Sequence, residues 1–555
     1  MTRSFTLALA IAVGALTFCG CRPVRFADRA ILWHDPDDRP IPMPHARPDI
    51  PINWEGARDA IFQPADHLFG LEYGKQAENV NALDEVPDSS WYSDPRRDPR
   101  VVGDPAPEPL APEAIARGAA TEEPPVPPYT IRAGKSIGSA PGFVVDDARG
   151  RRYLFKLDPA GRAGLVTSTE VVSTRLAWAS GWRVPSETIV RFSPSELVLP
   201  PDVTRHDQYD HEVLFTRLAL DQMLSAAGRV GGNIQAVASR WLPGRTVGEF
   251  SWFGRVKDDP NDRVDHEDRR DLRGFGIFAA WIDDTDTLQN NTLDTYLGAP
   301  GDGHVVHWQQ DVGGSMGVFA ADASPFWMGR ESYFQPGRIL GSFFSLGAMV
   351  RPWEGERVRA ARDRLVSLYP ELGFFDVAHF APRDWHPILE NPAFVRQTAR
   401  DRYWGAKRVI AFRPDELKAA ISAGRYRPVA AERLFQVLWG RRQKIAQAFL
   451  GESAPLDYFQ LEGDRLCFDD LWLSSGLGGK EGTSYLAREP EESQRALPIS
   501  DGGRDDLKCV ALAPKDGYRI IELRVSRPGQ RHFGRPVRVH LVEHAGRRHL
   551  IGIER

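Results

Sequence analysis

Three polar residues between positions 286 and 311 have the types and the spacing of a site for phosphoryl transfer. Asp286 is followed five residues later by Asn291, and Asp311 opens an Asp-Val-Gly-Gly turn after an alternating apolar-polar run. In such a site one carboxylate orients the attacking hydroxyl, while an Asn and a second carboxylate hold the metal that bridges the phosphates. We therefore take Asp286 as a candidate base, and Asn291 and Asp311 as candidate metal ligands.

Lys156 and Glu170, upstream of these acids, are a candidate cation and its partner. Lys156 is the one polar residue in an apolar run with the pattern of a strand, so it either faces solvent or meets an anion. Glu170 lies near the start of a helix expected over residues 165–180, where the helix dipole alone favours an acid. The alternative is an ion pair with Lys156, which is the pairing that positions a phosphate-binding lysine. Both alternatives stay open here.

Elements of regular structure must bring these residues together. Two strands are expected between residues 129 and 157, and a third over 234–241. A largely apolar helix, with Asp265 and Asp268 as candidate N-caps, runs to about Trp281 and leads directly into the acids. This order, sheet first and then a buried helix that ends at a loop of acids, predicts two lobes with a cleft between them.

The chain of 555 residues is too long for one hydrophobic core, and its texture divides it further. Residues 22–128 are rich in Pro, which predicts an extended arm and, from about 100, a linker. A β-rich lobe is expected over 129–245, a helical lobe over 246–452 and a small β domain over 453–555. A net charge of -5 gives no basic face for nucleic acid, and we exclude that partner.

The N-terminus has the features of an export signal. Residues 1–21 begin with a basic residue, continue with an apolar run that is too short for a membrane span, and end in small residues beside cysteine. Gly20-Cys21 resembles the cleavage box of bacterial lipoproteins, in which the cysteine is lipidated. We therefore expect a signal peptide and an anchor at Cys21 on a membrane of the cell envelope, facing the periplasm or the exterior.

Cys467 and Cys509 are the only cysteines after Cys21. An exported chain lies in an oxidising compartment, so a disulfide between them is expected, with two buried thiols as the alternative. Closing a loop of that length is worth roughly 4 kcal/mol in the chain-entropy model.

Taken in order, these features resemble the protein-kinase-like superfamily, most closely its atypical HipA-type, CotH-type and secretory-pathway kinases. The resemblance covers about residues 130–330 and, less specifically, the region to 450. It implies an α+β fold with a β-rich N-lobe and a helical C-lobe, and ATP with Mg2+ or Mn2+ in the cleft. The roles that it implies are a loop over the nucleotide at Gly138 and Gly142, phosphate binding by Lys156, orientation of Lys156 by Glu170, the catalytic base Asp286, and the metal ligands Asn291 and Asp311.

Whether catalysis is retained stays open. The sequence differs from the usual kinase pattern before Asp286, where Asp284-Thr285 replaces His-Arg, and after Asp311, where Val312 replaces Phe. The rival interpretation is a non-catalytic lipoprotein that binds a partner in the cell envelope. If the chain is an enzyme, the phosphate acceptor is a protein, a sugar or a small molecule, and the sequence does not distinguish them.

Four other kinds of site match parts of the sequence. Asp283, Asp284, Asp286 and Asp294 could bind calcium, although the loop lacks the EF-hand pattern. Paired carboxylates could also serve a glycosidase. A hydrolase elbow could lie at Gly313-x-Ser315-x-Gly317, and His304 and His307 could bind a metal, except that residues three apart on a strand point to opposite faces.

Overall fold

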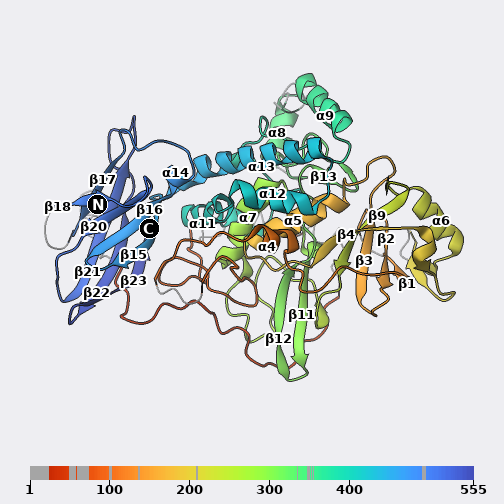
Figure 1. The fold of residues 1–555 in the computed structure, drawn as a ribbon, viewed down its shortest axis with the longest axis horizontal. Coiled ribbons are helices and arrows are strands. Elements are labelled where there is room, and N and C mark those ends of the chain that lie inside the picture. Colours follow the sequence, from red (N-terminus) through yellow and green to blue (C-terminus); the bar gives the residue numbers. More distant parts are fainter. Residues whose placement is uncertain are drawn as a thin grey trace, which may run out of the picture.

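The computed structural model describes residues 24–48, 58, 74–98, 103–135, 138–207, 211–333, 336–346, 351, 353, 355–490 and 495–555. The fold is a mixed α+β fold. Figure 1 shows a curled sheet at one end of the long axis, two further sheets near the C-terminus at the other end, and helices between them. The predicted signal peptide and Cys21 lie outside the described residues.

A seven-stranded sheet carries Lys156. Its strand order is β4-β9-β3-β2-β1-β5, with β8 paired to β9. The strands are β1 (Tyr129–Gly134), β2 (Gly142–Asp146), β3 (Arg152–Leu157), β4 (Glu187–Phe192), β5 (Leu197–Val198), β8 (Arg229–Val230) and β9 (Asn233–Arg240). Successive side chains of a strand point to opposite faces. Phe155 and Leu157 are buried in the apolar core on one face, so Lys156 points to the other.

Helix α5 (Thr167–Ala179) covers that other face of the sheet. Val171 of α5 packs against Ile189 and Val237 of the sheet. The apolar face is covered by α6 (Arg217–Ser225), which follows a short hairpin of β6 (Thr204–His206) and β7 (Glu212–Leu214). Lys156 therefore lies between the sheet and the helix that bears Glu170.

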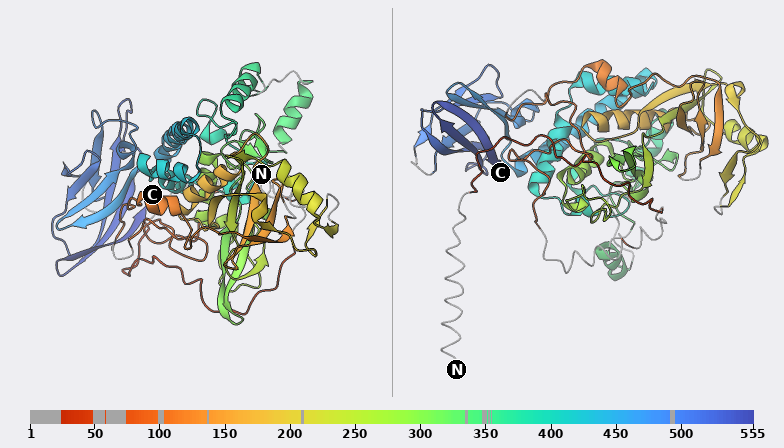
Figure 2. Two further views of the ribbon diagram at one scale, coloured as in Figure 1. Left: turned by 45° about the vertical axis from the view of Figure 1, so that its right-hand side comes forward. Right: turned by 90° about the horizontal axis from the view of Figure 1, so that it is seen from below.

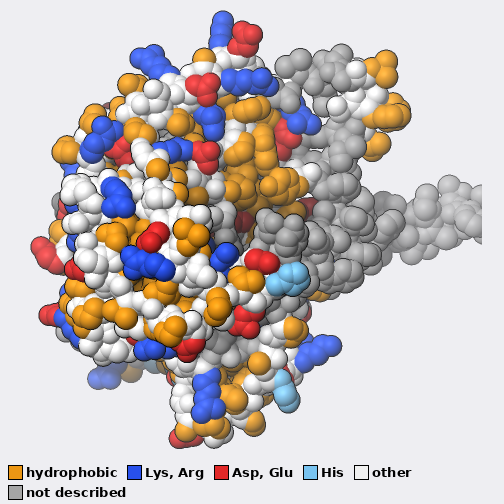
Figure 3. Space-filling model, turned by 90° about the vertical axis from the view of Figure 1, so that its right-hand side faces the viewer, with side chains coloured by type: hydrophobic (Ala, Val, Ile, Leu, Met, Phe, Trp, Pro, Cys, Tyr) orange, Lys and Arg blue, Asp and Glu red, His pale blue; other side chains and the backbone are white. Residues whose placement is uncertain are grey.

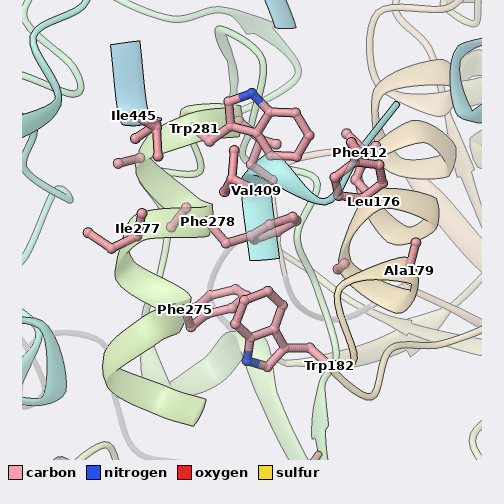
Figure 4. Close-up of a cluster of buried hydrophobic side chains, with 14 of the residues drawn as sticks. Leu176, Ala179, Trp182, Phe275, Ile277, Phe278, Trp281, Val409, Phe412 and Ile445 are labelled. Carbon is pink, nitrogen blue, oxygen red and sulfur yellow. The ribbon is translucent and has the colours of Figure 1, made fainter. Parts of the chain in front are cut away.

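Helix α7 (Arg270–Ile282) forms the centre of the helical region. Figure 4 shows its apolar side chains facing those of α5, with Phe275 and Phe278 against Trp182. The other helices are α4 (Pro112–Arg117), α8 (Pro336–Phe344), α9 (Glu356–Leu368), α10 (Pro392–Val395), α11 (Ala399–Ile410), α12 (Pro414–Ala423) and α13 (Pro428–Phe449). The expected N-caps are wrong: Arg269 precedes α7 without a side-chain cap, because the Asp268 carboxylate instead pairs with Lys75 and Arg273.

After α7 the chain enters a hairpin that lies between the acids of the candidate site. Strands β11 (Thr292–Ala299) and β12 (Asp302–Gln309) pair in register, with β10 (Arg245–Gly248) beside β11. Asn291 immediately precedes β11 and Asp311 closely follows β12, so the hairpin returns the chain to its starting point. A small hairpin, β13 (Val318–Phe319) with β14 (Asp322–Ala323), comes next.

The residues after 453 form two antiparallel sheets. One has the order β15-β16-β20-β19 and the other the order β18-β17-β21-β22-β23. Cys467 and Cys509 are directly opposed on neighbouring strands and are joined by a disulfide. The elements are β15 (Leu456–Glu462), β16 (Arg465–Asp470), α14 (Leu471–Ser474), β17 (Ser484–Arg488), β18 (Ala496–Leu497), β19 (Ile499–Asp501), β20 (Leu507–Ala511), β21 (Gly517–Ser526), β22 (Val537–His544) and β23 (Arg547–Glu554).

The described part of the Pro-rich region is extended but not detached. Figure 2 shows it running from the C-terminal sheets along the helices toward the β11–β12 hairpin. At one end Asp28 bonds to His549 at 2.6 Å, and at the other Ile41 bridges to Gly303. The stretch expected to be a linker contains α4, whose Ile115 is fully buried in the main core. Among the described residues, no helix is long and apolar enough to span a bilayer.

Candidate functional site

Lys156 holds two carboxylates at once. Its ammonium donates to Glu170 Oε1 at 3.0 Å and to Asp311 Oδ2 at 2.8 Å, and its side chain is only 6% exposed. Burial alone lowers the pKa of Lys156, but the charges of Asp311 and Glu170 outweigh it and hold this pKa well above its usual range. Of the two earlier alternatives for Lys156 and Glu170, the structure has the ion pair. Three sequence-distant elements, β3, α5 and the turn after β12, thus meet at one ammonium.

In the cluster around Lys156, carboxyl groups outnumber ammonium groups. Burial raises the pKa of Glu170 to about 7, with Asp311 adding to the shift and Lys156 opposing it. Burial and the Glu170 charge raise the pKa of Glu187, on β4, to about 8. A second cation, Lys135, follows β1, and burial together with the Lys156 charge lowers its pKa to about 8. Desolvation and repulsion between the acids raise the pKa values of these carboxyl groups toward neutrality. A bound cation would oppose both effects.

Asp286 and Asn291 are joined through the backbone. The Asn291 carboxamide donates a short hydrogen bond to the Asp286 carbonyl, and the amides of Gln310 and Asp311 donate to the Asn291 carbonyl at 2.8 and 3.2 Å. Desolvation and the charge of Asp311 raise the pKa of Asp286 to about 6. The Asp286 side chain is half-buried, so it remains open to a substrate hydroxyl.

The carboxyl group of Asp284 has the least favourable environment for a charge in the site. Its carboxyl group is 1% exposed, and neither oxygen has a hydrogen-bond partner among the described residues. Burial, followed by the charges of Asp286 and Asp311, raises the pKa of Asp284 well above its usual range. In contrast, Asp311 accepts from the Gly313 amide at 2.9 Å, and its contacts with Lys156 outweigh burial and lower its pKa.

The two glycines after Val312 permit this convergence. A Cβ at Gly313 would lie 2.5 Å from Glu170 Cγ, and a Cβ at Gly314 would lie 2.7 Å from Asp286 Cβ. Real Cβ atoms essentially never approach so closely, so a side chain at either position would push the acids apart. The turn after Asp311 therefore explains why the segment is Gly-Gly.

The expected glycine loop lies at the edge of the same site. Gly142 begins β2 directly opposite Lys156, and a Cβ there would clash with the Phe155 carbonyl. Gly138 has φ +85° and a Cβ built on it would lie 2.9 Å from the Lys135 ammonium. That ammonium donates to the Ala140 carbonyl at 2.9 Å, so it folds back over the loop.

The structure thus brings together all the residues predicted between Gly138 and Asp311. Sequence reasoning missed Lys135 and Glu187 as site residues, and it considered Asp284 only as a possible calcium ligand. Glu187 begins a strand as an ordinary alternating polar residue, and nothing local marks it. Asp284 carried a signal, because it closely follows a largely apolar helix and lies two residues before Asp286.

The structure does not assemble the hydrolase elbow or the histidine metal pair, and it separates Asp294 from the other acids. Ser315 is fully buried with its hydroxyl 2.6 Å from that of Ser173, which leaves no room for a hydrolase elbow. Asp294 is held by His307 at 2.6 Å and by Arg47, so it does not join the other acids. His304 and His307 occur on opposite faces of β12, as expected.

The chemistry of the oxygen donors in the site suits a divalent cation. Oxygen donors from Asp284, Asp286, Asn291, Glu170 and Asp311 are of the kind that Mg2+ and Mn2+ prefer. The orphaned oxygens of Asp284 and the free Oε2 of Glu170 are buried atoms that need a partner. On the face shown in Figure 3, acidic and basic side chains are interspersed.

Comparisons with known proteins add little. No protein-family model matches the chain, and no curated protein matches it. Two solved structures of the Golgi casein kinase are similar, one of them with Mn and ADP bound. The first is 12% identical, covers 54% of this chain and 74% of that one, and has a TM-score of 0.23. The second is 11% identical, covers 56% and 74%, and has the same TM-score. At these values we base no inference on the similarity.

Proposed function

We propose that the chain is an atypical, kinase-like phosphotransferase that uses ATP and Mg2+ or Mn2+. Residues 129–245 would be its β-rich N-lobe, 246–452 its helical C-lobe, and 453–555 a small β domain. The observation that carries the proposal is the Lys156 ammonium, which is held between Glu170 and Asp311 while Asp286 lies within the same cluster of acids. Phosphoryl transfer requires such a cation, base and metal ligands in one place.

Each residue has a distinct role in this proposal. Lys156, oriented by Glu170, binds the nucleotide phosphates, and the loop with Gly138 and Gly142 covers them. Asp286 accepts the proton of the acceptor hydroxyl as the new P–O bond forms and the bond to the ADP oxygen breaks. A pKa of about 6 leaves Asp286 mostly ionised at neutral pH yet still basic enough to receive that proton.

Asn291 and Asp311 would hold the divalent cation, with Asp284 close by. When bound, that cation neutralises charge that develops on the phosphate oxygens. Asp284 deprotonates more easily beside a cation, so its raised pKa links metal affinity to pH.

The rival function is that of a non-catalytic envelope protein on a kinase-like core. One observation favours it: Asp311 is already paired with Lys156, so binding a cation and phosphates requires that contact to open. Export and lipidation at Cys21 rest on the sequence alone and are proposed for either function. They would place the protein at a membrane surface, facing the periplasm or the exterior.

A transfer assay separates the two functions. The chain is incubated with γ-labelled ATP and Mn2+ or Mg2+, and both self-labelling and phosphate release are followed. Asp286→Asn should lower the rate by at least about 100-fold, because general-base catalysis contributes that much. Asp302→Asn, at the exposed turn of the β11–β12 hairpin, should leave it unchanged. Metal-dependent nucleotide binding without transfer or hydrolysis would favour the rival.

A further inference from the structure

A second cavity lies next to the loop that carries Asp286 but is separate from the site described above. It has a volume of about 320 Å3, which is within the range of small-molecule sites. Asp283 lines it, whereas Asp286, Asn291 and Asp311 do not. The remaining walls come from residues 324–330, from the connection between α9 and α10, and from α13.

Arg330 is the unused donor of this cavity. Arg330 is half-buried and its guanidinium carbon lies 5.9 Å from the centre of the Phe374 ring. Among the described residues, its side chain has no hydrogen-bond or ion-pair partner. Burial lowers the pKa of Arg330, and the more distant charges of Asp283 and Asp376 oppose that shift. A half-buried guanidinium of this kind keeps donors that can meet an anion entering the cavity.

Arg441, the other arginine of the cavity, already has hydrogen-bond partners within the protein. It donates to the carbonyls of Trp281 and Ala280 at 2.8 and 2.7 Å and so caps the C-terminal end of α7. It also reaches Asp283 at 3.3 Å. Arg441 is therefore a structural residue, and the free positive charge belongs to Arg330.

The acids of the cavity interior, Asp283 and Asp376, also have hydrogen-bond partners within the protein. Asp283 accepts from the Trp385 indole at 3.0 Å, in addition to Arg441. Asp376 contacts Nδ1 of His379 at 2.5 Å and accepts from the His379 amide at 3.1 Å. These bonds orient the imidazole and leave its Nε2 for a ligand. Asp384 lines the cavity but is exposed to solvent, so its charge is screened.

The geometry points to a binding site for a small organic anion, whose phosphate or carboxylate group meets Arg330 and whose ring packs against the aromatic side chains that line the cavity, Phe374 among them. Arginine matches either head group with two parallel N–H donors, and aromatic walls favour a flat body over a bare ion. Asp283 ends α7 in a left-handed conformation three residues before Asp286. An occupant would therefore lie against the loop that carries the candidate base. The site does not depend on the proposed phosphotransfer.

Calorimetric titration of the purified chain tests this site. The probes are phenyl phosphate, benzoate and inorganic phosphate. At least one phenyl probe should bind saturably and more tightly than inorganic phosphate. Which phenyl probe binds identifies the head group.

Matched variants locate the binding. Arg330→Gln should weaken it at least tenfold, because a charge-assisted hydrogen bond is lost, and Arg330→Lys should weaken it less. Arg357→Gln, on the exposed face of α9, should not change it. Lys156→Met should retain it, since Lys156 serves the other site. No binding of either phenyl probe, unchanged binding by Arg330→Gln, or its loss in Lys156→Met would each overturn the proposal.

Discussion

Two clusters of buried charge differ in how their charges are balanced. The first, here called the arm network, joins the Pro-rich region to α7 and α11. In it Arg270 pairs with Asp401 at 2.9 Å and with Asp84 at 2.5 Å, while Arg273 pairs with Asp401 at 3.0 Å. The second is the candidate site, where Glu170, Glu187 and Asp311 lie around Lys156, with Lys135 nearby. Asp284 and Asp286 belong to the same site through their repulsion with Asp311.

The pKa shifts express this difference. In the arm network, the arginines outweigh burial and lower the pKa of Asp84. In the site, burial and repulsion raise the pKa of four of the five carboxyl groups, and only Asp311, bound to Lys156, moves down. Balanced buried charge fixes a structure, whereas unbalanced buried charge indicates a missing cationic partner. We therefore assign the first cluster to folding and the second to ligand binding.

Breaking the arm network should have the largest effect on stability. Asp401→Ala leaves two buried guanidinium groups without their shared partner and should lower the free energy of unfolding by about 3–5 kcal/mol. Denaturant unfolding measures this. As a control, Asp415→Ala removes an exposed pair with Arg413 and should cost less than about 1 kcal/mol. Equal costs for the two variants would contradict the distinction.

A side chain at Gly314 should reduce the stability of the fold less than Asp401→Ala does, but it should reduce ligand binding more. The new methyl group of Gly314→Ala would meet Asp286 and should destabilise the fold by about 1–3 kcal/mol. The variant should also lose the response to nucleotide and metal. Gly503→Ala, where the methyl group enters open space, should change neither quantity. Thermal unfolding with and without ligands measures both.

The two clusters should respond to pH in opposite directions. Glu170, Glu187 and Asp286 have folded-state pKa values of about 7, 8 and 6, above their unfolded values, so the folded chain binds more protons between about pH 4 and 8. Their contribution to stability therefore falls as pH rises from 5.5 to 8.0. The lowered pKa of Asp84 instead gives stability that is lost only at acid pH.

Glu187→Gln isolates the pH effect of the site. It removes one titrating carboxyl group, so it should retain about 3 kcal/mol more stability at pH 8.0 relative to pH 5.5 than the native chain does. Urea unfolding at the two pH values provides the comparison. An identical pH dependence in the variant and the native chain would show that Glu187 is not protonated in the folded state.

Asp284→Asn should have the smallest effect on stability. Burial raises the pKa of Asp284 and so favours its neutral form, and Asn has nearly the same shape, so we expect a change of less than about 0.5 kcal/mol without metal. Mn2+ affinity should nevertheless fall at least tenfold, because the variant cannot release a proton and become a charged ligand. Titration with Mn2+ alone measures this, and unchanged affinity would remove Asp284 from the site.

Much of the candidate site could be predicted from the sequence, because its parts have local signals. Lys156 interrupts an apolar strand, Glu170 starts a helix, and Asp311 opens a glycine turn. The contacts between them depend on how the sheet, α5 and the hairpin pack, and the sequence left their pairing open. Glu187 and Lys135 had no local signal, because their importance arises only from burial beside Lys156.

The region before the sheet was less predictable. Its Pro content correctly indicated an extended chain, but composition does not show what an extended chain packs against. Ile115 and Arg96 are buried by α12, α5 and their surroundings, which lie far away in sequence. The N-cap expected at Asp268 failed in part for the same reason, since its carboxylate pairs with Lys75 of the distant Pro-rich region as well as with Arg273 of α7 itself.

Thermal unfolding with ATP and Mn2+ tests the central claim most directly. The native chain should unfold at a higher temperature when nucleotide and metal are present together, because a ligand that binds only the folded state stabilises it. Asp311→Asn should fold but lose this shift, and Asp302→Asn should keep it. A shift that Asp311→Asn retains, or no shift in a folded native chain, would contradict the assignment of the Lys156 cluster to nucleotide and metal.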